Sequence, residues 1–173
     1  MIYIVDHVYN DPATEAEWHA WYAGYLQRLL SVPGIHSAQR FKAIGHTPSR
    51  YLAMYSIESE EVYSSAGYKG IGGGGSQSAR FHFAYALWTR NLFAGLDRAP
   101  RVGSAGRLLA WDSSEPEATG ELAPRITWLR SVGLHQTTPY RALVVLDGAE
   151  ADRLREPAGS ILYEPFTDCM VAA

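Results

Sequence analysis

Hydrophobic positions near the N-terminus first follow the pattern of a strand and then that of a helix. Residues 2–9 (IYIVDHVY) are rich in β-branched and aromatic side chains and contain no Gly or Pro, which is typical of a β-strand. From Trp18, apolar residues recur at steps of four, three and four as far as Leu29, which indicates one face of an amphipathic helix. Residues 32–34 (VPG) end this helix, because proline cannot continue it and glycine suits the turn.

The following residues predict three further strands and a second, shorter helix. Residues 35–43 and 51–57 have the composition of strands and flank a turn-forming loop at 45–48 (GHTP). Residues 59–68 predict a short helix, and residues 81–88 predict a fourth strand. The order β-α-β-β-α-β is that of a ferredoxin-like unit, in which two helices cover one face of a four-stranded antiparallel sheet.

The second half of the chain repeats parts of this pattern. Residues 131–135 (SVGLH) resemble residues 31–36 (SVPGIH), and residues 141–146 (RALVVL) resemble residues 50–55 (RYLAMY). These matches occur in the same order in both halves, which favours a duplication. Because short apolar strands also resemble one another by chance, unrelated halves stay an alternative.

These patterns predict a fold class and a division of the chain. We expect an α+β protein in which the ferredoxin-like βαββαβ unit occurs twice, with two antiparallel sheets packed face to face as an α/β barrel. The first half is expected to cover residues 1–95, followed by a linker at 96–104 and a second, eroded half at 105–173. In that half the first helix is expected to shrink to about residues 124–130, and the last strand to lie at 161–171.

Composition and charge exclude several classes of protein. Hydrophobic residues make up 47% of the chain, enough for a packed core, and a formal net charge of −3 argues against a nucleic-acid partner. No apolar run approaches the roughly 20 residues of a membrane-spanning helix, and the first residues lack the features of a secretory signal. We therefore expect a cytoplasmic protein with no membrane partner. Cys169 is the single cysteine and no two histidines have metal-binding spacing, so we expect neither a metal site nor a cofactor.

Four short segments of the first half carry a resemblance to a known group of proteins. They are residues 21–22 (WY), 29–35 (LLSVPGI), 37–41 (SAQRF) and 51–55 (YLAMY), and on them the chain resembles the dimeric α/β-barrel superfamily, particularly its EthD-like members. That superfamily includes muconolactone isomerases, cofactor-free quinone-forming monooxygenases, polyketide cyclases, aldoxime dehydratases and haem peroxidases, so the resemblance implies architecture more than chemistry. It also implies a ligand pocket between a sheet and its two helices. Related sequences often carry a His shortly after Trp-Tyr, where this chain has Tyr25.

His7 is the first candidate for catalysis in such a pocket. Alternation along the first strand places Tyr3, Val5, His7 and Tyr9 on one face of the sheet. An imidazole between tyrosines can act as a general base near neutral pH, although a core histidine bonded to a neighbouring group has the same pattern. His82, on the predicted fourth strand, is the second candidate.

Aromatic residues and one arginine are the other candidates for the site. Tyr22 and Tyr25 lie on the apolar face of the first helix, where a phenol can donate a hydrogen bond to a developing enolate or simply pack in the core. An arginine beside a tryptophan can bind a carboxylate or enolate oxygen. The expected substrate-binding residues are Tyr3, Tyr9, Trp18, Trp88 and Arg90.

Two further features call for an explanation. Asp6 lies in the middle of an apolar strand and needs a partner, for which Arg40 and Arg90 are candidates; Asp112 occupies the matching place in the second half, which favours a structural ion pair. Residues 70–75 (GIGGGG) lack the Gly-Lys-Ser/Thr of a phosphate-binding loop, so we expect a mobile cover over the pocket or a plain linker.

These expectations combine into one functional hypothesis with two alternatives. The main hypothesis is a cofactor-free acid–base enzyme, of isomerase, cyclase, lyase or decarboxylase type, that acts on a small aromatic or polyketide-like molecule. The alternatives are a non-catalytic EthD-like ligand-binding or accessory protein, and a cofactor-free monooxygenase. The expected partner is a small apolar or aromatic ligand, and a homodimer stays an open option.

Overall fold

The structure is a computed structural model, and it describes residues 1–117, 120–154 and 157–173. The strands in this part of the chain are β1 (Ile2–Tyr9), β2 (Ile35–Ala43), β3 (Ser49–Ile57), β4 (Tyr85–Ala94), β5 (Gly106–Ser113), β6 (Thr127–Leu134), β7 (Tyr140–Asp147), β8 (Ile161–Pro165) and β9 (Met170–Val171). The α-helices are α1 (Glu15–Leu30), α2 (Ala66–Gly70) and α3 (Gly148–Ala151), and the 3₁₀ helices are η1 (Glu60–Ser64), η2 (Ser76–Ala84) and η3 (Ala123–Arg125).

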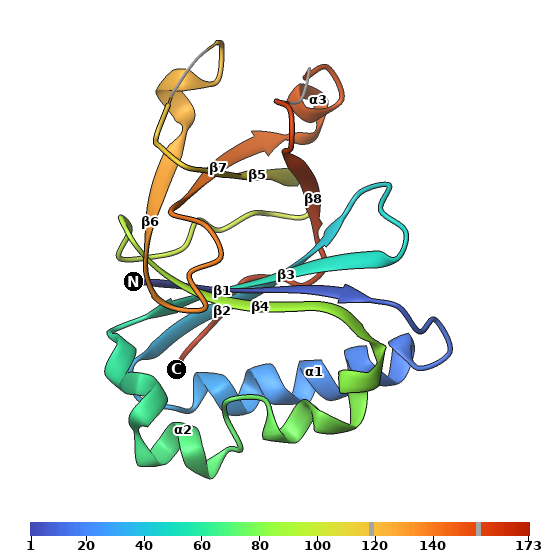
Figure 1. The fold of residues 1–173 in the computed structure, drawn as a ribbon, viewed down its shortest axis with the longest axis vertical. Coiled ribbons are helices and arrows are strands. Elements are labelled where there is room, and N and C mark those ends of the chain that lie inside the picture. Colours follow the sequence, from blue (N-terminus) through green and yellow to red (C-terminus); the bar gives the residue numbers. More distant parts are fainter. Residues whose placement is uncertain (118–119, 155–156) are drawn as a thin grey trace.

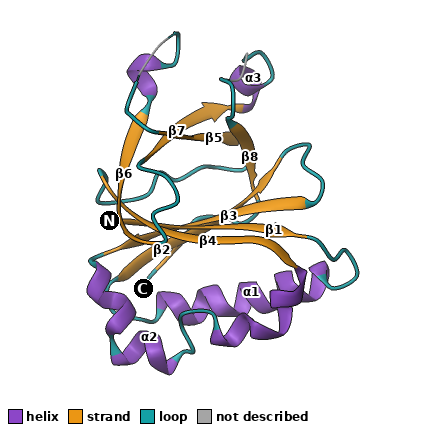
Figure 2. Ribbon diagram, viewed as in Figure 1, coloured by secondary structure: helices purple, strands orange, loops and turns teal. Residues whose placement is uncertain are grey.

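Strands β1 to β8 form one closed antiparallel barrel (Figure 1). Their order around the barrel is β3-β1-β4-β6-β7-β5-β8-β2, and β2 pairs with β3 to close the ring. The short strand β9 pairs with the other end of β2. Helices α1 and α2 and the 3₁₀ helix η2 cover the outer face of β1 to β4, whereas α3 and η3 lie at the opposite end of the molecule (Figure 2).

The expectation of two ferredoxin-like sheets packed face to face is therefore wrong. Strand β4 pairs with β6 and strand β8 pairs with β2, so hydrogen bonds join both parts of the chain into a single barrel. Closure satisfies the backbone groups that two separate sheets would leave unpaired at their edges. Around the barrel, the strands of the second part of the chain, β6-β7-β5-β8, nevertheless have the same relative order as those of the first part, β2-β3-β1-β4. The division of the chain at residues 96–104 stays a prediction.

Several expected elements differ from those observed. Residues 124–130 do not form one α-helix: the first two belong to the 3₁₀ helix η3, and residues 127–130 belong to β6, whose backbone pairs with β4 and β7. Residues 81–88 are not one strand either: η2 continues to Ala84, and Phe81 packs into the core beside α1. The expected helix at 59–68 is divided into η1 and α2 at Ser65, whose side chain accepts a hydrogen bond from the backbone N–H of Tyr68.

Strand β1 separates two hydrophobic cores. Ile2 and Ile4 point into the barrel, whereas Tyr3, Val5 and Tyr9 point towards α1, as the alternation predicts. Helix α1 packs on this outer face through the buried residues Trp18, Tyr22, Leu26 and Leu29. Burying each side chain of this size stabilises the fold by about 1.5–3 kcal/mol. The outer core contains the space in which a ligand can bind.

The partner of Asp6 is Arg141, not Arg40 or Arg90. Arg141 on β7 donates from Nη1 to Asp6 at 2.7 Å, and from Nε and Nη2 to Asp112 at 2.7 and 3.0 Å. Both carboxylates therefore share one guanidinium that is nearly excluded from solvent. The barrel brings β7 close to β1, which is why the partner comes from the second half. This arrangement gives Asp6 a structural role.

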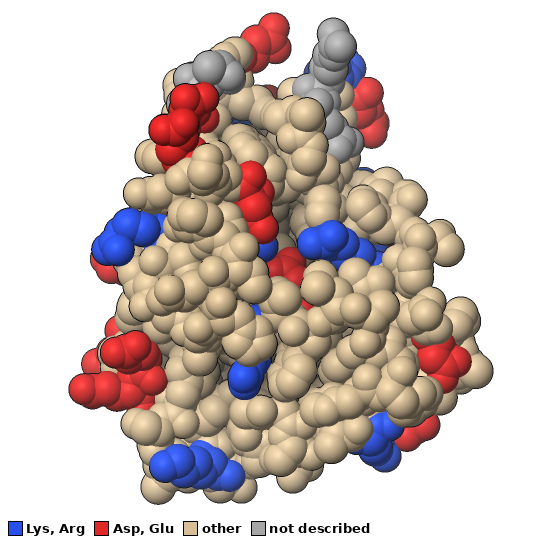
Figure 3. Space-filling model, viewed as in Figure 1, with Lys and Arg blue, Asp and Glu red and all other residues tan. Residues whose placement is uncertain are grey.

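Charged residues are dispersed over the face of the molecule shown in Figure 3. Acidic and basic side chains alternate with uncharged ones there and form no continuous charged surface. Among the described residues, no helix is both long and apolar enough to span a bilayer.

Candidate functional site

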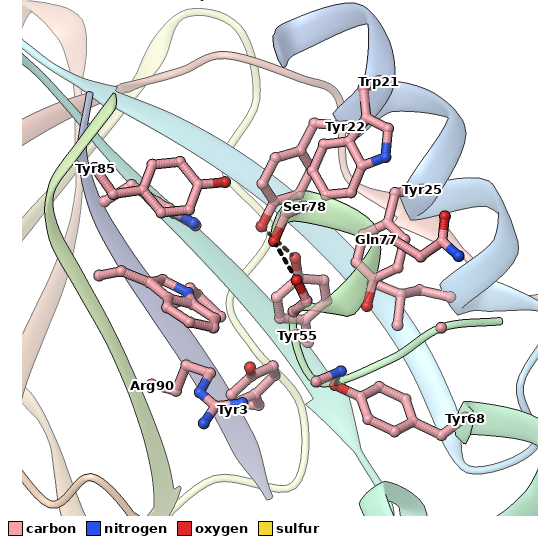
Figure 4. Close-up of a pocket in the computed structure, with 17 residues that line it drawn as sticks. Tyr3, Trp21, Tyr22, Tyr25, Tyr55, Tyr68, Gln77, Ser78, Tyr85 and Arg90 are labelled. Carbon is pink, nitrogen blue, oxygen red and sulfur yellow. Dashed lines mark hydrogen bonds between the residues drawn. The ribbon is translucent and has the colours of Figure 1, made fainter. Parts of the chain in front are cut away.

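A cavity lies in the outer core, between the sheet and the helices that cover it. Its empty volume, including the mouth, is about 470 Å³. The centre of a water molecule can be placed in about 40 Å³ of this space without a clash. Strands β1, β3 and β4 supply one wall, and α1, α2 and η2 supply the other (Figure 4). The lining residues are Tyr3, Val5, His7, Trp21, Tyr22, Tyr25, Leu29, Tyr55, Tyr68, Gly72, Gly74, Gly75, Gln77, Ser78, Tyr85, Trp88 and Arg90.

This lining is strongly aromatic and has no acidic side chain. Six of its residues are tyrosines and two are tryptophans, while Arg90 is its one full charge. Aromatic walls bind flat apolar molecules, and phenol hydroxyls add hydrogen bonds to polar atoms of the ligand. Because no carboxylate in the lining neutralises Arg90, the cavity favours a ligand that carries or develops negative charge.

His7 lies at the centre of the β1 wall and faces this cavity. The residue is 3% exposed, and Trp18, Tyr22 and Tyr85 surround its ring edge-on, with ring centres 5.3, 5.9 and 5.1 Å away. Burial, reinforced by the positive charge of Arg40, lowers the pKa of His7 to about 3. The imidazole is therefore neutral at pH 7. Its side chain lines the cavity and has no hydrogen-bond partner among the described residues, so its nitrogens are available to a ligand.

Tyr22 and Tyr55 form a hydrogen-bonded pair in the cavity wall. Their hydroxyl oxygens are 2.9 Å apart, and Figure 4 shows both of them near the centre of the site. Burial raises the pKa of both phenols, and the nearby Arg40 partly offsets this for Tyr22. When one hydroxyl donates to the other, the second hydroxyl keeps a proton that it can donate to a ligand oxygen.

Tyr25 lies beside this pair at the same wall. Its ring stacks on Trp21 at 5.2 Å and lies 6.2 Å from the ring of Tyr22. Burial raises its pKa, so the phenol stays protonated at neutral pH. The structure thus brings His7, Tyr22 and Tyr25 to one cavity, which the strand and helix periodicities together predict.

Arg90 and Trp88 supply the part of the lining contributed by β4. The Arg90 guanidinium carbon lies 4.8 Å from the centre of the Trp88 ring, and Nη2 lies 3.3 Å from Nε2 of His135. Its buried Nε has no hydrogen-bond partner within the described part of the chain. This cation can therefore bind an anionic oxygen without first releasing a carboxylate.

The glycine segment (residues 70–75) covers the cavity by close approach to two aromatic rings. A Cβ atom at Gly73 would lie 2.4 Å from the Tyr68 ring, and one at Gly75 would lie 2.5 Å from the Trp88 ring. Gly75 also has a φ of +100°, which disfavours any other residue. Close packing on the lining explains these glycines. Whether the segment moves stays a prediction.

Three of the candidate residues lie behind the lining. Trp18 stacks on Tyr9 with ring centres 4.6 Å apart, and its Nε1 donates to the Tyr85 hydroxyl at 2.9 Å. His82 belongs to η2, where its Nε2 lies 2.9 Å from the Ser78 hydroxyl and its ring packs on Trp88. These residues hold lining side chains in place.

Sequence reasoning missed several lining residues. Tyr55, Tyr68 and Tyr85 all reach the cavity, and only Tyr55 had a usable signal, since it alternates with the barrel-facing Leu52 and Met54 along β3. Tyr68 and Tyr85 depend on where η1, α2 and η2 begin and end, which the sequence pattern left open. Within residues 1–117, 120–154 and 157–173, no three His, Cys, Asp or Glu side chains are grouped as a metal site.

Three solved structures are similar to this chain over almost its whole length. An anthrone oxidase-like protein has a TM-score of 0.62 at 12% identity, covering 99% of this chain and 93% of its own. A proposed monooxygenase from Fusobacterium nucleatum subsp. nucleatum has a TM-score of 0.55 at 7% identity, covering 99% and 92%. Another from Lactobacillus acidophilus has a TM-score of 0.54 at 7% identity, covering 99% of each chain. No protein-family model and no curated protein matches the sequence. At these identities the likeness establishes a shared fold.

Proposed function

We propose that this protein is a cofactor-free oxygenase that oxidises a small aromatic molecule with an acidic C–H or O–H group. The observation that carries the proposal is His7, a neutral imidazole without a protein partner that faces an aromatic cavity. The names of the similar structures, an anthrone oxidase-like protein and two proposed monooxygenases, favour oxygen chemistry over simple proton transfer. The EthD-like resemblance of the first half of the chain is compatible with this class.

His7 is proposed to start the reaction by accepting a proton from the substrate. The resulting enolate or phenolate is rich in electrons and reacts with dioxygen at carbon. For an anthrone-type substrate, one oxygen atom becomes the new ketone oxygen, and the other leaves as water with the two hydrogens lost from that carbon. Dioxygen is the oxidant, so no further electron donor is required.

The polar groups of the lining support the proposed role of His7 as a base. An imidazole with a pKa of about 3 is a weak base in the unoccupied cavity. Its pKa rises when a negative charge forms beside it, because the imidazolium and the anion then stabilise each other. The Tyr22–Tyr55 pair can donate a hydrogen bond to the anionic oxygen, and Arg90 supplies a positive charge. The aromatic walls exclude water, which strengthens these interactions.

Other functions of the same cavity have distinct signatures. An isomerase or cyclase would use His7 for proton transfer without consuming oxygen, and a binding protein would retain the ligand unchanged. Oxygen uptake therefore separates the proposal from both alternatives.

The test measures oxygen consumption with anthrone and with a hydroquinone as substrates. We expect uptake that depends on the protein and, with ¹⁸O₂, one labelled atom in the quinone product. His7→Gln should lower the rate by about a hundredfold or more, as expected when a general base is lost. His46→Gln, in an exposed loop, is the matched control and should leave the rate unchanged. Conversion of a substrate without oxygen uptake would contradict the proposal and favour the acid–base alternative.

A further inference from the structure

A buried cation lies directly behind the wall of the cavity. Arg40 on β2 is 2% exposed, and its guanidinium carbon lies 3.9 Å from the centre of the Tyr22 ring. The rings of Trp18, Tyr51 and Phe166 lie around it at 4.7, 5.6 and 5.2 Å. Within the described part of the chain, no carboxylate forms a salt bridge with this guanidinium. Most buried charges in proteins are paired, so this one requires an explanation.

A chain of hydrogen bonds leads from Arg40 away from the cavity. Its Nη2 lies 3.2 Å from Nδ1 of His19, whose Nε2 lies 3.0 Å from the Tyr51 hydroxyl. The Tyr51 hydroxyl donates to Glu15 at 2.6 Å. Because a guanidinium can only donate, His19 accepts at Nδ1 and carries its proton on Nε2. Burial, reinforced by Arg40, lowers the pKa of His19 to about 4, so this histidine is neutral.

The positive charge of Arg40 is therefore not neutralised by a group in contact with it. The carboxylate of Glu15 is separated from it by two side chains, whereas Tyr22, which lies against the guanidinium, has its hydroxyl in the cavity wall. Charges in a protein interior are screened much less than charges at the surface. Arg40, behind the Tyr22 ring, and Arg90, in the lining, give the cavity two nearby cations, and the lining contains no carboxylate.

We propose that Arg40 makes this cavity selective for aromatic anions, namely phenolates, enolates and aromatic carboxylates. Arg40 acts through Tyr22 and is a positioning residue, since it does not itself reach the ligand. The proposal rests on the oxygenase function and deepens it, because Arg40 would stabilise the substrate anion that forms when His7 accepts the proton. At an effective dielectric constant of about 20, Coulomb attraction between unit charges separated by one side chain is sufficient to change affinity by a factor of about ten or more.

A purely structural role for Arg40 makes a different prediction. Cation–π contacts with four rings stabilise the fold whether or not a ligand is present. Loss of such contacts would weaken the binding of charged and neutral ligands alike. The test therefore needs a readout that responds to ligand charge and not to folding.

The pKa of bound 4-nitrophenol provides this readout. This single-ring phenol changes its absorbance on ionisation, and its pKa in water lies near neutrality. Preferential binding of the phenolate lowers the pKa of the bound phenol, by about one unit for a tenfold preference. The titratable and charged groups facing the cavity or its wall are Tyr3 and His7 on β1, Arg40 on β2, Tyr55 on β3, Tyr85 and Arg90 on β4, Tyr22 and Tyr25 on α1, and Tyr68 on α2. Of these, only His7 ordinarily titrates near neutral pH, and here it is neutral.

Three proteins should separate the two roles of Arg40. In the natural protein, the pKa of bound 4-nitrophenol should fall by about one unit or more. Arg40→Met keeps an apolar stem without the charge and should remove about one unit of that fall, whereas Arg40→Lys should restore most of it. Binding of benzamide should be the same in all three, while benzoate should lose about tenfold in Arg40→Met.

The outcomes that overturn the proposal are equally specific. They are an unshifted phenol pKa in the natural protein, or equal losses of benzoate and benzamide binding in Arg40→Met. If Arg40→Met does not fold, Arg40→Gln, which also removes the charge, takes its place in the same measurements of the phenol pKa and of the ratio of benzoate to benzamide affinity. None of these ligands needs to react with oxygen. Failure of the oxygenase proposal and failure of anion selectivity are therefore distinguishable.

Discussion

Asp6 and His7 are adjacent on β1, yet they belong to opposite sides of the barrel wall. Asp6 points inward to Arg141, which it shares with Asp112, and His7 points outward into the cavity. One short strand therefore holds both a structural ion pair and the proposed base. A register shift of one residue would exchange the two sides, so the ion pair also fixes the position of His7.

Asp6→Asn should destabilise the fold considerably. It removes the inner of the two carboxylates that share the buried Arg141 guanidinium, and loss of such a charged hydrogen bond costs about 1.5–3 kcal/mol in the free energy of unfolding. Asp112→Asn is the matched control: its side chain is 46% exposed, so the loss should be about 1 kcal/mol. Urea unfolding measures both. Equal losses would show that the inner carboxylate has no special role.

Protonation of His7 in the unfolded chain, but not in the folded one, should make the protein less stable in mild acid. The folded-state pKa of about 3 lies below the ordinary value of 6.5, so between these values the unfolded chain binds more protons than the folded chain. Stability should therefore fall as pH decreases from about 6.5 to 3, and His7 contributes up to about 1.4 kcal/mol per pH unit. His7→Gln should flatten this dependence between pH 4 and 6. His19 titrates in the same range, so some dependence should persist. An unchanged slope would contradict a neutral, buried His7.

Tyr22→Phe should impair activity more than Tyr25→Phe. The first substitution removes the hydroxyl 2.9 Å from Tyr55 and leaves that buried hydroxyl without its partner, at a cost of about 1–3 kcal/mol in stability. Loss of a donor to the anionic oxygen should also lower kcat/KM by about tenfold to a thousandfold. Tyr25 is less buried and lies outside this pair, so its replacement should have a smaller effect. Steady-state kinetics and thermal unfolding would reveal a reversed order.

Gly75→Ala should weaken ligand binding, whereas Gly70→Ala should not. A methyl group at Gly75 would meet Trp88 at 2.5 Å on a backbone with φ of +100°, which requires the glycine segment or the ring to shift. We expect a loss of about 1–3 kcal/mol in stability and a lower affinity for aromatic ligands. Gly70 ends α2 and has no neighbouring atom within 4 Å of an added methyl group, which makes it the control. Calorimetric titration with 4-nitrophenol measures both variants.

Local periodicity explains how much of this site the sequence could predict. Alternation along β1 and helical spacing in α1 are properties of neighbouring residues, and they place His7, Tyr22 and Tyr25 at one cavity. The pairing of β4 with β6, and the ion pair between Asp6 and Arg141, join residues far apart in the chain, where no local pattern exists. The same limit concealed Arg40, whose aromatic surroundings come from α1, β3 and the C-terminal region.

The narrowness of the cavity has a kinetic consequence. The volume in which the centre of a water molecule fits is about 40 Å³, whereas a cavity that binds benzene has roughly 150 Å³. A diatomic gas can enter such a space, but an aromatic ring cannot do so until the side chains or the glycine segment give way. Ring-shaped ligands must therefore wait for an opening event, and their observed association rate should level off at high concentration instead of rising linearly. Dioxygen is small enough for the existing space, so its entry needs no such opening event.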